Sequence, residues 1–125
     1  MGDDLACVRA LYPALAAGDR AALEALLAED FTGEFAAGMP VGGGPAASRA
    51  EALEHWWAIG RAFAVRAEPE ELLRCEGGRV VVRGAYRGRR RAGGGPVEAA
   101  FLHLWRLRDG RAAHLVQVTD TARWG

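Results

Sequence analysis

The final third of the chain, residues 97–120, contains two apolar runs joined by Asp109-Gly110. An Asp-Gly pair between alternating apolar residues predicts a long antiparallel hairpin, because these two residues accept the positive φ angles of a tight hairpin turn. His103 and Gln117 interrupt the two runs. Polar groups set into an otherwise apolar face predict that this hairpin forms the wall of a pocket.

The length of 125 residues predicts a single domain, 1–125, with a sizeable core. The formal net charge is zero and half of the residues are hydrophobic, which argues against a nucleic-acid partner or an acidic membrane surface. No apolar run approaches the roughly 18 residues that span a bilayer, and the acidic start is unlike a signal peptide, so we expect a cytoplasmic protein. Cys7 and Cys75 lie far apart and outside any CxxC spacing, which favours two reduced thiols.

The first half of the chain carries the helical signals. Apolar residues at helical spacing predict three helices, over residues 3–17, 20–29 and 49–63. Pro13 predicts a kink in the first helix. Gly18 and Asp19 end this helix and cap the second, and Ser48 caps the third.

The rest of the chain reads as strands separated by glycine-rich turns. We expect a short strand over residues 31–35, a Gly- and Pro-rich loop over 38–48, and longer strands over 65–75, 79–90, 96–108 and 111–121. Helices followed by an antiparallel meander predict an α+β fold, with the helices packed on one face of a curved sheet.

Several short motifs accompany this order of elements: LxAGD after the first helix, LLAEDF at the end of the second, and a terminal DGR…VTDTARW. Together they resemble the NTF2-like superfamily over the whole chain, and within it the SnoaL-like polyketide cyclases and ketosteroid-isomerase-like proteins. The resemblance implies a cone-shaped fold of three N-terminal helices on a strongly curved, mainly antiparallel sheet. It also implies a hydrophobic pocket and a homodimer through the convex sheet face. Both faces of the strand from Val97 are mostly apolar, which predicts that both are buried.

The resemblance places His103 at a catalytic position. In ketosteroid isomerase a tyrosine and a protonated aspartic acid form the oxyanion hole, and LHLWRL here puts His103 at the place of that acid. In SnoaL-like cyclases a histidine on the penultimate strand works with an aspartate on the last. His103 is therefore a candidate for acid/base work or carbonyl polarisation. The alternative is a buried histidine satisfied by a neighbour.

The carboxylates that the resemblance implies are missing. The general-base position of ketosteroid isomerase falls at Phe35, with Glu34 beside it, and an exposed glutamate is the favoured interpretation there. The cyclase aspartate is replaced by Gln117, whose carboxamide hydrogen-bonds but takes no proton. Asp120 is the nearest acid to this position.

The hairpin register decides which residue faces His103. A three-residue loop, 108–110, with a bulge at Gly110 places Gln117 on the face of His103 and turns Asp120 away. A two-residue loop of Asp109-Gly110 instead places Asp120 on that face. The bulged form is favoured.

The candidate site has two parts. The catalytic candidates are His103, Gln117, Asp120 and Tyr12. The candidates for the substrate-binding wall are Phe35, Trp56, Tyr86, Phe101, Trp105 and Leu115. Adjacent tryptophans on a helix point apart, so we expect one of Trp56 and Trp57 in the cavity and the other toward solvent or a partner, and His55 exposed. No metal-ligand spacing or phosphate loop is present, and no cofactor is expected.

Three functions follow as hypotheses. The first is a SnoaL-like protein that acts on a hydrophobic, carbonyl-containing metabolite by cyclase- or isomerase-type acid/base chemistry. The alternative is a non-catalytic ligand-binding or dimerisation module. A third, weaker one is a polyanion-binding hairpin built on the arginines of residues 87–91, although a solvated face is the favoured interpretation of such a run.

Overall fold

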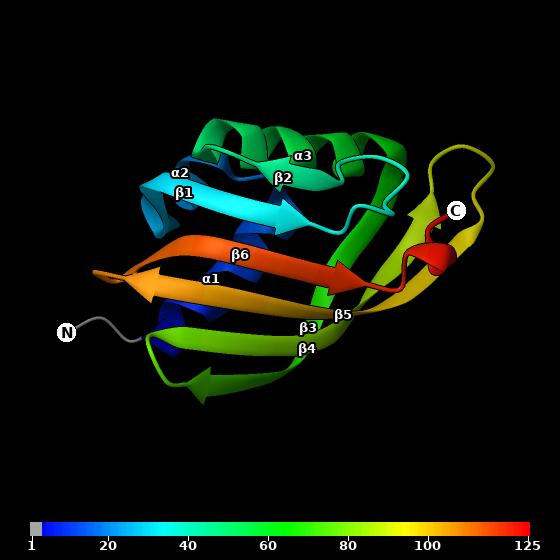
Figure 1. Cartoon of the computed structure of the whole chain (residues 1–125). Helices are drawn as coiled ribbons and strands as arrows, with labels where there is room; N and C mark the ends of the chain where they lie inside the picture. Colours follow the sequence, from blue (N-terminus) through cyan, green and yellow to red (C-terminus); the bar gives the residue numbers. More distant parts are fainter. Residues whose placement is uncertain (1–3) are drawn as a thin grey trace.

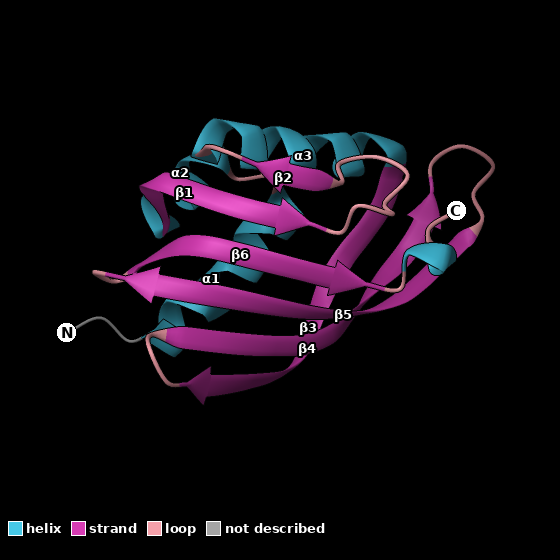
Figure 2. Ribbon diagram, in the orientation of Figure 1, coloured by secondary structure: helices cyan, strands magenta, loops and turns pink. Residues whose placement is uncertain are grey.

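The computed structural model describes residues 4–125. Figures 1 and 2 show how its helices and strands are arranged. The elements are α1 (Asp4–Ala17), α2 (Arg20–Leu26), β1 (Leu27–Phe35), β2 (Gly44–Ala46), α3 (Arg49–Ala62), β3 (Phe63–Cys75), β4 (Arg79–Arg90), β5 (Pro96–Arg108), β6 (Arg111–Thr119) and the short 3-10 helix η1 (Thr121–Arg123). The three predicted helices and the four long strands are confirmed.

The helix ends follow from their capping residues. Gly18 takes a φ of 63°, and the Asp19 N–H returns to the Ala14 carbonyl at 3.0 Å, which closes α1. The Asp19 side chain then accepts the Ala22 N–H at 3.1 Å and starts α2. Ser48 accepts the Glu51 N–H at 3.1 Å and starts α3 in the same way. The predicted start of α1 at Asp3 lies outside the described residues.

The six strands form one sheet in the order β2-β1-β6-β5-β4-β3. The β1–β6 pair is parallel and the other pairs are antiparallel. The resemblance implies a strongly curved cone, whereas the sheet shown here is open, with β2 and β3 at its two edges. The predicted end of the second helix at Glu29 is wrong, because Leu27 already pairs with Ala112 of β6.

The helices cover only one face of this sheet. In Figure 1, α1 crosses behind the strands and α3 lies along the upper edge, so the face toward the viewer is bare. Along β5 the odd positions, including Phe101 and Trp105, are buried, whereas the even positions are mostly exposed, with Leu102 at 48%. The expectation that both faces are buried is wrong for the single chain, because α1, α2 and α3 do not cover the outer face.

Two smaller observations complete the fold. Cys7 is buried, Cys75 is exposed, and both are free thiols. Burial raises the pKa of the Cys7 thiol. Within residues 4–125, no helix is both long and apolar enough to cross a bilayer.

Candidate functional site

A cavity of ≈ 300 Å³ lies between the helices and the inner face of the sheet. Its floor is formed by β4, β5 and β6, and its walls by the end of α1, the second half of α3 and the start of β3. The lining residues of the floor are Tyr86, His103, Trp105, Leu115 and Gln117. This volume is at the lower end of the range for small-molecule pockets, about 300–1,000 Å³.

The β5–β6 register brings His103 and Gln117 together. Arg108 pairs with Arg111, so the loop consists only of Asp109 and Gly110, with φ angles of 52° and 78°. The expected bulge at Gly110 is therefore misplaced. The irregularity lies at Ala113 instead, since Arg106 pairs with His114 and Leu107 with Ala112. This extra residue restores the favoured outcome, in which His103 pairs with Gln117.

His103 and Gln117 are the two buried polar residues among those that the structure describes, each 3% exposed. Both nitrogens of His103 are engaged: Nδ1 lies 2.7 Å from the Tyr12 hydroxyl and Nε2 lies 2.7 Å from the Tyr86 hydroxyl. The Gln117 Nε2 donates to the Tyr86 hydroxyl at 2.7 Å. Four residues from α1, β4, β5 and β6 thus form one hydrogen-bonded cluster.

Two further donors complete the ends of this cluster. The Trp105 indole N–H donates to the Tyr12 hydroxyl at 3.0 Å. The Ala36 backbone N–H donates to Gln117 Oε1 at 3.1 Å. No buried side-chain nitrogen or oxygen of the described chain is left without a partner. Each side-chain nitrogen and oxygen of the cluster therefore has at least one hydrogen-bond partner, as in most buried polar networks.

Burial keeps this cluster uncharged. It lowers the pKa of His103 to about 3, because the imidazolium form loses its hydration without gaining a counter-ion. Burial also raises the pKa of both Tyr12 and Tyr86. At neutral pH the cluster therefore offers a neutral imidazole, two protonated phenols and a carboxamide.

The acidic candidates lie outside the cavity. Asp120 caps η1, its backbone N–H bonds to the Ala100 carbonyl, and its carboxylate lies 3.6 Å from Arg123. Glu34 is exposed and accepts from His114 Nε2 at 3.2 Å. No Asp or Glu is among the residues that line the cavity.

Comparison with known proteins gives the family. The model of the SnoaL-like domain matches residues 8–115. The chain belongs to the SnoaL-like domain family. No curated protein matches it.

Solved structures of NTF2-like proteins share the fold of this SnoaL-like domain. An NTF2-like protein of unknown function from Burkholderia pseudomallei is 30% identical, with 98% of this chain and 94% of that chain covered and a TM-score of 0.85. IdmH from Streptomyces antibioticus, provisionally described as a polyketide cyclase, is 22% identical over 98% and 95%, with a TM-score of 0.82. TerC, co-crystallised with polyporic acid, is 24% identical over 95% and 92%, with a TM-score of 0.83.

The substrate-binding candidates of the SnoaL-like domain divide into two groups. Trp56, Tyr86, Trp105 and Leu115 line the cavity. Phe101 and Phe35 do not line it but support residues that do. Phe101 stacks on His103 with ring centroids 4.0 Å apart, and Phe35 packs edge-on against Trp56 at 5.6 Å. Tyr12 does not line the cavity either, but it bonds to His103 and Trp105, which do.

Two expectations about α3 are wrong. Trp56 and Trp57 both line the cavity, because two side chains roughly 100° apart on a helix both border a cavity that follows the helix as far as Ile59 and Gly60. His55 is half-buried rather than exposed, since its Nδ1 donates to the Gly42 carbonyl at 2.8 Å and its ring stacks on Phe35.

The sequence interpretation missed part of the site. Ala36, which orients Gln117, carried no signal, because its backbone N–H acts and not its side chain. Arg91 lines the cavity, although it was predicted only as part of a basic hairpin. Its Nε donates to the Gly60 carbonyl at 2.8 Å, which holds the guanidinium at the end of α3.

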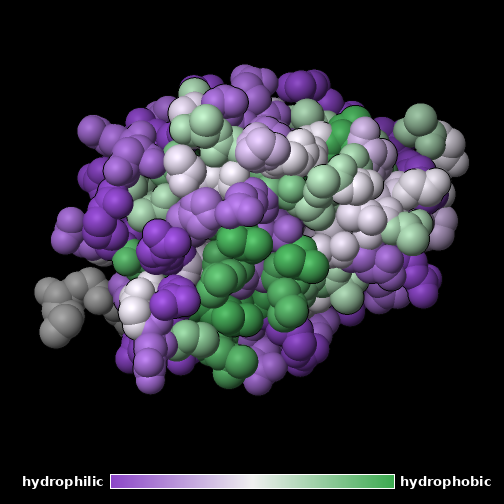
Figure 3. Space-filling model, in the orientation of Figure 1, coloured by the Kyte–Doolittle hydropathy of each residue, from purple (hydrophilic) through white to green (hydrophobic). Residues whose placement is uncertain are grey.

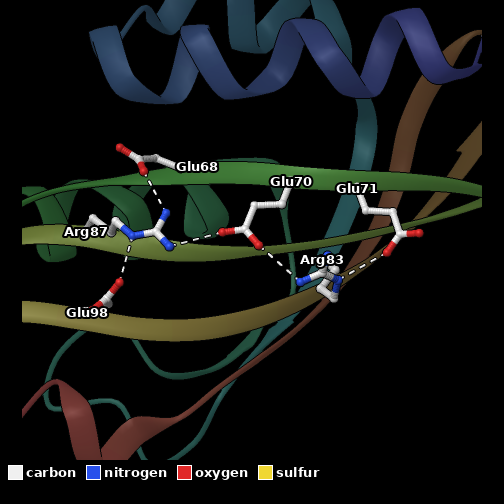
Figure 4. A network of polar contacts seen from close by, with 6 residues as sticks. All are labelled: Glu68, Glu70, Glu71, Arg83, Arg87 and Glu98. Carbon is white, nitrogen blue, oxygen red and sulfur yellow. Dashed lines mark hydrogen bonds and ion pairs between the residues drawn. The ribbon is translucent and has the colours of Figure 1, made fainter.

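The other arginines of this run bind within the chain. Arg87 contacts Glu68 at 2.8 Å, Glu70 at 3.1 Å and Glu98 at 2.9 Å on the outer face of the sheet (Figure 4). These carboxylates raise the pKa of Arg87. Arg89 and Arg90 donate to backbone carbonyls. The charges of the run are thus engaged rather than gathered into one free basic surface. Among residues 4–125, no group of three or more His, Cys, Asp or Glu side chains is placed to hold a metal ion.

Proposed function

We propose that this SnoaL-like domain binds a hydrophobic, carbonyl-containing metabolite in the cavity and acts on it without a cofactor, by cyclase- or isomerase-type chemistry. One observation carries the proposal: a satisfied polar cluster of His103, Tyr86 and Gln117 lies at the floor of a cavity walled by apolar side chains. The proposal includes what the resemblance implies for the shape, namely that the sheet and the helices enclose this cavity as a cone. The descriptions of IdmH, provisionally a polyketide cyclase, and of TerC, co-crystallised with polyporic acid, support this substrate class.

The roles follow from the contacts. Tyr86 lines the cavity and is protonated, so its hydroxyl is the group that meets a ligand carbonyl. His103 and Gln117 hold the Tyr86 oxygen in place, and Tyr12 holds His103. A pre-positioned hydrogen-bond donor stabilises charge that develops on a carbonyl oxygen, as during enolisation. His103 therefore positions Tyr86 and does not act as the proton acceptor.

A second candidate is a binding module without catalysis. It is favoured by the absence of carboxylates from the cavity lining and by Gln117 at the position of the cyclase aspartate. Both candidates require a ligand carbonyl at Tyr86. They differ in whether the bound carbonyl compound loses an α-proton, which passes to solvent water or hydroxide, because no carboxylate lines the cavity and both nitrogens of His103 are engaged.

A matched pair of ligands tests the proposal. We expect α-tetralone, a bicyclic aromatic ketone, to bind about three- to tenfold more tightly than tetralin, which lacks the carbonyl, in titration calorimetry. Tyr86→Phe should remove this preference, and Leu102→Ala on the outer face should retain it. Equal binding of the two compounds by the parent protein would refute the proposal.

Hydrogen exchange then separates enzyme from binding module. The enzyme accelerates exchange of the α-hydrogens of α-tetralone in deuterated water, followed by proton NMR, and Tyr86→Phe loses the acceleration. Ketone-selective binding with exchange no faster than in buffer would establish the binding module.

We also propose a homodimer through the outer face of the sheet. Leu73, Leu102 and Val118 are 47%, 48% and 55% exposed on this face. Leu102 pairs with Val118 across β5 and β6, so the apolar side chains are adjacent. Figure 3 shows a hydrophobic patch at the centre of the same face. A patch of this kind, surrounded by charged residues, is typical of a protein interface.

A further inference from the structure

The directions of the hydrogen bonds in the buried cluster follow from its two ends and from which tyrosine borders the cavity. The Trp105 indole N–H and the Ala36 backbone N–H are donors and have no acceptor capacity at nitrogen. Trp105 donates to the Tyr12 oxygen, and Ala36 donates to Gln117 Oε1. These two fixed donors restrict what each remaining group can do.

The orientation of Gln117 is settled by Ala36. Because Oε1 accepts the Ala36 N–H, the amide nitrogen is the atom that faces Tyr86. The carboxamide nitrogen can only donate. Gln117 therefore occupies one lone pair of the Tyr86 oxygen.

The tautomer of His103 is settled by Tyr12. The Tyr12 hydroxyl has two partners, the Trp105 indole and His103 Nδ1, and the indole accepts nothing. Either tautomer leaves one phenol hydrogen without an acceptor inside the cluster: that of Tyr12 if Nδ1 carries the hydrogen, and that of Tyr86 if Nε2 carries it. Tyr86 borders the cavity, where a ligand can accept its hydrogen, whereas Tyr12 does not, so we infer that Tyr12 donates to Nδ1. A neutral imidazole that accepts at Nδ1 carries its hydrogen at Nε2.

The Tyr86 oxygen is the acceptor at the end of both series of hydrogen bonds. Its oxygen accepts from His103 Nε2–H at 2.7 Å and from Gln117 Nε2–H at 2.7 Å, which uses both lone pairs. Its own hydrogen finds no acceptor among these partners, and the residue borders the cavity. The Tyr86 hydroxyl is thus a free donor with no remaining acceptor capacity.

We propose, building on the proposed function, that the cavity selects ligands whose oxygen is an anion or a pure acceptor, namely enolates and phenolates, over ligands with a neutral hydroxyl. A neutral phenol or enol at Tyr86 accepts the tyrosine hydrogen, but the Tyr86 oxygen, His103 Nε2 and Gln117 Nε2 have no lone pair left to accept the ligand's own hydrogen. An enolate or phenolate has no such hydrogen, so it makes the same contact without an unsatisfied donor. The contact is also charge-assisted, which strengthens it.

The charges around the cavity favour the same ligands. The titratable side chains of the lining are Tyr86 of β4, His103 of β5, Arg66 of β3, and Arg91, which follows β4. The first two are neutral and the other two are cations, and no carboxylate lines the cavity. Nearby positive charge stabilises an anion, and no negative charge opposes it.

The apparent pKa of a bound phenol measures this selectivity. 2-Naphthol changes its absorption spectrum on ionisation, so its pKa can be read in the presence of saturating protein. We expect the bound pKa to lie below the value in buffer by about one unit or more, equivalent to roughly tenfold tighter binding of the naphtholate. 2-Methoxynaphthalene, which has no ionisable group, reports the affinity of the aromatic frame alone.

Three variants assign the effect to the named groups. Tyr86→Phe should return the bound pKa to the buffer value, and Arg91→Gln should reduce the shift. Arg106→Gln removes an exposed arginine from the outer face and should leave the shift intact. Nitrogen NMR of His103, identified by loss of its signals in His103→Gln, should show hydrogen at Nε2 and none at Nδ1.

Several outcomes would overturn the inference. Three results would each contradict it: a bound pKa equal to or above the buffer value, failure of 2-naphthol to bind where 2-methoxynaphthalene binds, and an Nδ1–H tautomer of His103. The proposed function would still stand after any of these results if the protein prefers α-tetralone to tetralin. If none of these aromatic compounds binds, both proposals fail.

Discussion

His103 is held by two tyrosines, one on each ring nitrogen, and its side chain is buried. General acid–base catalysis favours a group whose pKa lies near the working pH, and burial has moved the pKa of this imidazole to about 3. At residue scale its function is therefore to fix the direction of hydrogen bonds. Tyr86, whose hydroxyl oxygen bonds to His103, is the residue that contacts the ligand in our proposal.

This burial has a consequence for stability. In the unfolded chain His103 takes up a proton near the ordinary histidine pKa of 6.5, whereas in the folded chain it does so only near pH 3. The neutral imidazole therefore favours folding fully above pH 6.5, and this contribution to stability is lost as the pH falls from 6.5 toward 3. Lowering the pH from about 7.5 to about 5 should therefore reduce the free energy of unfolding by about 2 kcal/mol through His103. Urea denaturation at the two pH values measures this loss.

The control for this measurement is another histidine. His103→Gln should flatten the pH dependence, whatever its effect on absolute stability, whereas His114→Gln retains His103 and should remain as steep as the parent. A His103→Gln variant as pH-dependent as the parent would show that the loss arises at other groups.

At the scale of elements, the β5–β6 hairpin shows what sequence determines. Its turn at Asp109-Gly110 and its alternation were predictable, because turn chemistry and two-residue periodicity are local. The bulge at Ala113 was not, since Ala112 and Ala113 are both small and buried and neither marks an extra residue. The sequence analysis favoured the pairing of His103 with Gln117, but it based this pairing on a bulge at Gly110 rather than at Ala113.

The start of β1 shows how tertiary pairing overrides local pattern. Leucines at 23, 26 and 27 form a helical stripe, yet Leu27 is the first residue of a strand because it pairs with Ala112 of β6. The parallel β1–β6 pair joins segments from opposite ends of the chain. Such pairing is invisible to local periodicity, as was β2 within a glycine-rich loop.

The whole molecule assembles the site from distant segments. The sequence identified His103, Gln117 and Tyr12 as candidates, each by its polarity or by resemblance. It could not show that Tyr12 and Tyr86 bond to the two nitrogens of one imidazole, since this requires α1, β4 and β5 to converge. The connectivity, rather than the list of residues, is what the structure adds.

The bare outer face is a property of the whole molecule as well. Leu102→Glu and Val118→Glu place carboxylates in the proposed dimer contact, and each should convert a dimer into a monomer in sedimentation velocity experiments, because an unpaired charge is costly in an apolar interface. Glu29→Gln, a charge change at an exposed residue outside this patch, is the control. A parent protein that sediments as a monomer at high concentration would contradict the dimer.

The central claim is that the Tyr86 hydroxyl donates a hydrogen bond to a ligand carbonyl in the cavity. The infrared stretching frequency of carbonyl-labelled α-tetralone reports this bond directly, because hydrogen bonding to the oxygen weakens the C=O bond. The bound ketone should absorb at lower frequency in the parent protein than in Tyr86→Phe. The same frequency in both proteins would contradict the claim.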